Sequence, residues 1–176
     1  TKVISTLIKL DNKNNFSLID GIKNLREECK KSINEGYNIL VLSDKKLEKG
    51  YIPIPSLLAL SSVHHYLIKS GLRSNADLIV ESGEPREVHH FCSLFGYGAS
   101  GVNPYLAIET VLNTSNNDEN AVKNYIKSTE YGMLKVMSKM GISTLQGYQG
   151  AQIFESIGLS KEFVDEYFTW TANKIG

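Results

Sequence analysis

The feature that most constrains the fold is an alternation of short apolar runs with longer amphipathic segments. Residues 38–44 (NILVLSD) form an apolar run closed by two polar residues, which is typical of a strand buried on both faces of a parallel sheet. Residues 77–82 (DLIVES) have the same character. Between them, residues 55–70 predict a helix with proline in its first turn, and Gly71 follows where a C-cap glycine is favoured. This order predicts parallel strands joined by right-handed helical crossovers.

The alternation continues on both sides of this unit. We predict further strands at 2–10, 98–103 and 142–145, and helices at 17–36, 85–95, 104–112, 152–157 and 161–168, with two more helices around Gly132 within 122–141. The chain of 176 residues is shorter than the roughly 200 to 250 residues of a closed eightfold barrel. The fold class is therefore α/β, with alternating βα units and a mainly parallel sheet. We expect four to five units in one domain, residues 1–176, as an open sheet or a partial TIM-barrel-like sheet.

Charge and apolar content exclude several classes of function. Lys plus Arg and Asp plus Glu both total 19, so the basic surface that nucleic acids require is not expected. No apolar run approaches the roughly 18 to 20 residues that span a bilayer, so we expect no membrane partner. Cys29 and Cys92 lie far apart without metal-ligand spacing, and we expect reduced thiols.

Polar residues at the ends of the predicted strands are the candidate site. In parallel α/β folds the carboxyl ends of the strands meet at one rim of the sheet, and this rule selects Ser43, Asp44, Glu81, Ser82, Asn103 and Gln146. The two carboxylates could bind a polar ligand or share a proton as an acid/base pair. They could instead cap helices or form bonds across an interdomain surface. The second interpretation is favoured because nothing in the sequence indicates a substrate.

Two other motifs favour structural roles. The loop 82–87 lies between a strand and a helix, where phosphates often bind, but Glu84 and Glu87 supply negative charge that would repel an anion. The histidines come as two adjacent pairs, 64–65 and 89–90. Adjacent helical residues point about 100° apart, so one face presents only two imidazoles, too few for a zinc site. We expect packed or hydrogen-bonded histidines, and we expect methionines 133, 137 and 140 to pack in the core.

Several longer strings resemble the large-chain glutamate synthase family. They follow the family's order and spacing from about Leu7 to the end of the chain, and they place it in the later part of the central domain. They are IPSLLA (54–59), ESGEPREVHHF (81–91), LFGYGA (94–99), VNPY (102–105), KVMSKMGIST (135–144) and GAQIFE (150–155). One departure is GYQ at 147–149, where many relatives have SYR.

The resemblance implies that the chain is part of a much longer enzyme, lying between a glutaminase domain and an FMN-binding domain. That enzyme would make two L-glutamates from L-glutamine and 2-oxoglutarate. It would pass ammonia through an internal tunnel, use FMN and an iron–sulfur cluster, and take electrons from NAD(P)H or ferredoxin. The implied partners are those two domains and a small flavoprotein subunit or ferredoxin. The implied location is the cytoplasm or a plastid.

The resemblance transfers no catalytic, cofactor-binding or metal-binding residue to this chain. The family's cysteine nucleophile has no counterpart at Thr1, and neither cysteine lies in an iron–sulfur motif. We therefore expect an inactive structural and coupling region whose interdomain or rim candidates are Asp44, Glu81, Arg86 and Asn103. The alternative is a free-standing barrel-type enzyme, or a flavin or small-ligand module, that uses the carboxyl ends of the strands.

Overall fold

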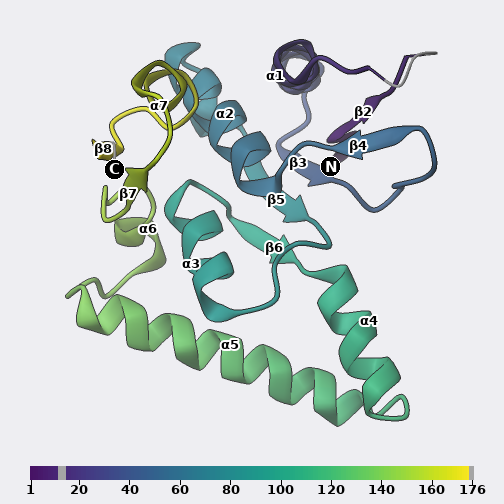
Figure 1. The fold of residues 1–176 in the computed structure, drawn as a ribbon. Coiled ribbons are helices and arrows are strands. Elements are labelled where there is room, and N and C mark those ends of the chain that lie inside the picture. The colour runs from purple at the N-terminus through teal and green to yellow at the C-terminus, as the bar shows by residue number, and fades with distance from the viewer. Residues whose placement is uncertain (12–14, 175–176) are drawn as a thin grey trace.

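A four-stranded parallel sheet forms the centre of the computed structural model, which describes residues 1–11 and 15–174 (Figure 1). Its strands are β1 (Lys2–Ser5), β3 (Ile39–Ser43), β5 (Asp77–Glu81) and β6 (Gly101–Asn103), in the order β1-β3-β5-β6. All three pairings are parallel. The predicted α/β class with a mainly parallel sheet is therefore confirmed.

Three helices connect these strands and pack on one face of the sheet. They are α1 (Leu18–Asn34), α2 (Ser56–Lys69) and α3 (Val88–Gly96). Because side chains alternate along a strand, every second residue faces these helices, and Leu42 and Val80 are buried in the same core as Leu25 of α1 and Val63 of α2. The alternate residues form the opposite face, where Val3 is 60% exposed.

The first predicted strand, 2–10, is wrong as a single element. It divides at the buried Thr6, whose backbone N–H donates to the Ser43 carbonyl at 2.9 Å. Beyond it, β2 (Leu7–Lys9) leaves the main sheet and pairs antiparallel with β4 (Tyr51–Pro53), a strand that the sequence analysis missed. A three-residue strand carries too short a pattern to stand out in the sequence.

The two helices predicted around Gly132 are one continuous helix, α5 (Glu119–Lys139), which follows α4 (Tyr105–Thr114). Gly132 does not break it, because its role is packing: a Cβ at this position would lie 2.4 Å from Cγ2 of Val88 on α3. The methionine prediction is right for Met137, which is buried, whereas Met140 is 53% exposed.

Two predictions near the C-terminus are wrong. Residues 142–145 do not form a strand, because the Thr144 hydroxyl accepts the Gly147 N–H and caps the short helix α6 (Leu145–Tyr148). Residues 152–157 do not form a helix, since β7 (Glu155–Ile157) pairs in parallel with β8 (Ala172–Lys174). The predicted helix at 161–168 is present as α7 (Lys161–Tyr167), and a 3₁₀ turn, η1 (Arg73–Asn75), precedes β5.

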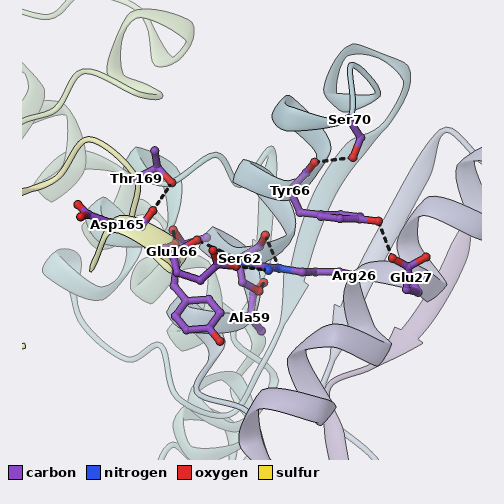
Figure 2. Close-up of polar contacts among 11 residues, drawn as sticks. Arg26, Glu27, Ala59, Ser62, Tyr66, Ser70, Asp165, Glu166 and Thr169 are labelled. Atoms are coloured by element: carbon purple, nitrogen blue, oxygen red, sulfur yellow. Dashed lines mark hydrogen bonds and ion pairs between the residues drawn. The ribbon is translucent and has the colours of Figure 1, made fainter. Parts of the chain in front are cut away.

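Arg26 of α1 fastens the C-terminal segment to the core (Figure 2). Its Nε donates to the Ser62 carbonyl of α2 at 3.2 Å, and its Nη1 pairs with Glu166 Oε1 of α7 at 2.5 Å. The guanidinium also lies 5.1 Å from the centre of the Tyr167 ring, within cation–π range. One side chain thus joins α1, α2 and α7.

No helix within 1–11 and 15–174 has both the length and the apolar content needed to cross a membrane.

Candidate functional site

A row of polar side chains lies at the carboxyl ends of the four parallel strands, directly above an apolar row. The strand register aligns the residues of each row across the sheet. The two rows are two residues apart along each strand, so they lie on the same face. The upper row is Ser5, Ser43, Glu81 and Asn103, and the row below it is Val3, Val41, Ile79 and Gly101. The predicted rim therefore exists, and it brings three of the four candidate residues together.

Asp44 is the most buried acid of this rim and is 7% exposed. Its carboxylate accepts hydrogen bonds from the Ser82 hydroxyl at 2.5 Å, the Gly83 N–H at 3.1 Å and the Tyr105 hydroxyl at 2.9 Å. Burial, and then the bond to Asp44, raises the pKa of Tyr105 to about 12, so this hydroxyl remains a donor at neutral pH. Charge-assisted bonds of this kind offset the cost of burying a carboxylate.

Glu81 is held in the same way by its neighbours in the sheet. It accepts from the Ser43 hydroxyl at 2.6 Å and from the Asn103 amide nitrogen at 3.0 Å. Lys45 Nζ lies 3.9 Å from the same carboxylate and 5.6 Å from the centre of the Tyr105 ring. The two carboxylates thus bond to separate sets of protein donors, and this geometry provides no shared proton.

Glu84, in the loop after β5, caps a helix. Its carboxylate accepts from both the backbone N–H and the hydroxyl of Ser56, at 2.8 and 2.5 Å, at the start of α2. The α2 N-cap is Pro55, which makes no side-chain cap bond. At α3 the N-cap Glu87 forms a capping box with His90. Acidic side chains therefore occupy the helix ends where a phosphate would otherwise bind, as the sequence analysis expected.

Arg86 lies outside this cluster. It is exposed just before α3, and its backbone makes two hydrogen bonds: the N–H donates to His90 Nδ1 at 3.1 Å and the carbonyl accepts from the Tyr125 hydroxyl at 3.0 Å. The structure thus brings together Asp44, Glu81 and Asn103 and leaves the Arg86 side chain on the surface.

Sequence reasoning missed Tyr105 and Lys45 as members of the rim. Lys45 directly follows Asp44, and Tyr105 comes two residues after Asn103, so chain proximity to a strand end could have identified both. The orientation of Tyr105 toward Asp44 depends on how α4 leaves the sheet, and the sequence pattern does not specify that direction.

The cysteines and histidines occupy packed or bonded positions. Burial raises the pKa of the Cys29 thiol to about 12, and burial also raises the pKa of Cys92, so neither thiol is activated as a nucleophile. His64 Nδ1 accepts from Arg73 Nε at 3.0 Å. Over the described ranges, no three residues among His, Cys, Asp and Glu are placed to hold one metal ion.

The rim does not fit a flavin phosphate. Asp44, Glu81 and Glu84 concentrate acidic groups there, and the donors near them already bond to these carboxylates. An anionic phosphate would meet like charge, and its binding would require these bonds to break. We therefore derive no flavin chemistry from these residues.

Comparison with protein families gives a match over most of the chain. The family model described as the glutamate synthase central domain matches residues 1–160. The chain is 49% identical over 162 residues to the NADPH-dependent glutamate synthase large chain of Bacillus subtilis, covering 89% of this chain and 11% of that protein. It is 45% identical over 170 residues to the NADH-dependent glutamate synthase of Saccharomyces cerevisiae, covering 89% and 8%.

A chloroplastic relative is similar over nearly the whole chain. The ferredoxin-dependent glutamate synthase of Oryza sativa is 40% identical over 193 aligned residues, covering 99% of this chain and 12% of that protein. The chain thus spans about a tenth of the length of these curated relatives.

Among solved structures, the chain resembles a variant of flavocytochrome b2 with benzoylformate. The TM-score is 0.62 and the sequence identity 17%, and the match covers 72% of this chain and 31% of that one. At this identity the likeness concerns the fold alone. It supports the description of the sheet as a partial TIM-barrel-like arrangement.

Proposed function

This chain belongs to the glutamate synthase central-domain family, and from this membership we propose that it is a structural and interdomain-coupling region of a longer glutamate synthase. Its partners would be the glutaminase and FMN-binding domains of the same polypeptide. Contacts of Asp44, Glu81, Arg86 and Asn103 with those domains would keep an ammonia path sealed. The family match and the exposed Arg86 next to an ordered rim support this role.

The parent enzyme would convert L-glutamine and 2-oxoglutarate into two L-glutamates. The relatives that this chain matches include NADPH-, NADH- and ferredoxin-dependent glutamate synthases. The electron donor would therefore be NADPH, NADH or ferredoxin, and its electrons would arrive directly or through a small flavoprotein subunit. FMN and the iron–sulfur cluster would be bound by other domains. The enzyme would work in the cytoplasm or in a plastid.

One observation carries the non-catalytic part of the proposal: both rim carboxylates are already bonded to protein donors. Asp44 accepts three bonds and Glu81 accepts two, without any substrate. An acid/base pair needs a proton that is free to move to a substrate. The geometry therefore favours a scaffold that orders loops over the alternative of a free-standing enzyme.

A flavin-retention experiment tests the scaffold role. The purified chain is mixed with FMN and desalted, and the visible absorbance of flavin in the protein fraction is measured. We expect no retained flavin, because acidic side chains occupy the rim. Stoichiometric flavin after desalting would contradict the proposal and would place a cofactor site at the ends of the strands.

A second experiment tests coupling in the full-length parent enzyme. Glu81→Ala and Arg86→Ala are combined, and the glutamine consumed per glutamate formed is measured together with released ammonia. We expect excess glutamine hydrolysis and ammonia release. Glu35→Ala combined with Lys31→Ala is the matched control, because this pair forms an exposed ion pair at the C-terminal end of α1, away from the rim. Unchanged stoichiometry in the Glu81/Arg86 variant would rule out the coupling role.

A further inference from the structure

A cavity of about 280 Å³ lies away from the rim, between α2, the segment after α6 and residues 169–171. Part of its wall is aromatic: Tyr97 stacks on Phe154 with ring centres 5.6 Å apart and planes 24° apart, and Trp170 also lines the cavity. The described residues that line it include no Asp, Glu, Lys or Arg. The cavity lining is thus uncharged and mixes aromatic with neutral polar side chains.

His65 supplies an unsatisfied polar atom to this wall. The residue is 8% exposed, and its Nε2 is buried without a hydrogen-bond partner in the part of the chain that the structure describes. Burial, followed by the charges of Lys69 and Arg26, lowers the pKa of His65 to about 4, so the imidazole is neutral at physiological pH. A buried nitrogen without a partner is uncommon in native proteins and calls for a specific explanation.

Trp170 lies against His65 but remains largely exposed. Its ring meets the His65 ring edge-on, with centres 6.4 Å apart, yet the residue is 68% exposed. Trp170 and Gln152, both in the cavity lining, have positive φ values of +69° and +54°. Strained backbone of this kind clusters at ligand-binding sites. The exposed indole can rotate without loss of core packing.

We propose that this cavity binds a neutral, planar nitrogen heterocycle of about the size of a purine, which stacks against Trp170 and forms a hydrogen bond with His65 Nε2. The aromatic wall selects a planar ring. The uncharged lining selects a neutral one, because a buried charge would have no partner. The volume lies just below the range of roughly 300–1,000 Å³ for drug-sized ligands, which favours a single fused ring system over a nucleotide. This binding site is independent of the coupling role.

Adenine is the probe, and Trp170 is the reporter because it is the only tryptophan in the sequence. Adenine is titrated into the purified chain at neutral pH while tryptophan emission is recorded. We expect a saturable change, and we expect benzoate, a planar anion, to bind at least roughly tenfold more weakly. No saturable change up to the solubility of adenine, or equal binding of benzoate, would overturn the proposal.

Two further measurements locate the ligand. His65→Leu is expected to weaken adenine binding roughly tenfold by removing the hydrogen bond, whereas His89→Leu, at an exposed histidine of α3, should leave it unchanged. In the unmodified chain, ¹⁵N NMR of the histidine rings should show an adenine-dependent shift at His65 and none at His89. This second readout remains valid if His65→Leu does not fold. A change in emission with no shift at His65 would mean that adenine stacks elsewhere, and the proposal would fail.

Discussion

The two ends of the parallel sheet are organised around charges of opposite sign. At the carboxyl ends of the strands, the Asp44 carboxylate accepts bonds from Ser82, Gly83 and Tyr105. At the amino ends, the guanidinium of Arg73 donates three bonds, which go to His64 Nδ1 at 3.0 Å, the Ala76 carbonyl at 2.6 Å and the Gly98 carbonyl at 2.9 Å. Each charge therefore joins segments that are distant in the sequence.

The two ends differ in burial and in the kind of partner. Asp44 is buried and takes two of its bonds from hydroxyl side chains, whereas Arg73 is half-buried and gives two of its bonds to backbone carbonyls. Because Arg73 itself lies closer to water than Asp44, water can more readily take the place of its side chain when that side chain is removed. A dense polar cluster at the carboxyl ends of parallel strands can thus serve stability, and the more buried charge is expected to contribute more of it.

The largest effect is expected from Asp44→Ala. The substitution leaves the Ser82 hydroxyl, the Gly83 N–H and the Tyr105 hydroxyl without their acceptor, and we expect the free energy of unfolding to fall by about 3 kcal/mol. Urea denaturation measures this change. Asp165→Ala, at an exposed carboxylate of α7, is the control and should change the free energy by less than about 0.5 kcal/mol. Equal stabilities of the two variants would contradict the assigned role of Asp44.

At the opposite end, Arg73→Met should cost about 2 kcal/mol in the free energy of unfolding. Three acceptors lose their donor, but the site is closer to water than Asp44, so the loss is smaller. Amide hydrogen exchange should increase in the loop around Gly98, where Arg73 holds the backbone. Arg73→Lys keeps the charge without the planar fork and should give an intermediate loss. No loss in Arg73→Met would contradict the assigned role of Arg73, and no loss in Arg73→Lys would show that the planar geometry is unimportant here.

The central sheet was predictable because its signals are strong and local. The run at 38–44 and the run at 77–82 both became parallel strands, and residues 17–36 became α1, with the Ser17 hydroxyl accepting the Asp20 N–H at its start. The rule that polar residues gather at the carboxyl ends of parallel strands correctly placed Asp44, Glu81 and Asn103 near one another.

The failures occurred where tertiary contacts override local signals. Gly132 was expected to separate two helices, but its missing side chain serves close packing against Val88. Residues 155–157 form a strand only because residues 172–174 lie beside them, and short strands of this kind depend on a partner that no local pattern identifies. The same limit applies to Tyr105, whose role at the rim depends on the direction of α4.

Tyr105→Phe tests the contribution of one bond at the carboxyl end. Loss of one hydroxyl bond to Asp44 should lower the free energy of unfolding by about 1 kcal/mol at neutral pH. The pKa of Tyr105 is raised from 10.0 to about 12 in the folded protein, so its contribution is complete below pH 10 and is lost as pH rises toward 12. The stability difference between wild type and variant should therefore shrink over this range. Tyr131→Phe, at a tyrosine that is 73% exposed, should show no such dependence.

The smallest effect at neutral pH, and one of opposite pH dependence, is expected from His64→Gln at the amino end. A glutamine oxygen can accept from Arg73 Nε, so the variant should be nearly as stable as wild type at pH 7. Burial, and then the charge of Arg73, lowers the pKa of His64 from 6.5 to about 3. As pH falls below 6.5, the unfolded chain takes up the proton before the folded protein does, so wild type loses stability that the variant keeps.

Gly98 packs closely against the buried His64. A Cβ at Gly98 would lie 2.1 Å from His64 Nδ1, and Gly98 has a φ of +100°. Glycine therefore both permits the backbone turn and leaves room for the imidazole. Urea denaturation of both proteins between pH 7 and 4 measures the difference, with His89→Gln as the exposed control. Parallel stability curves for wild type and His64→Gln would mean that protonated His64 finds a new partner, and the amino end would then tolerate two adjacent cations.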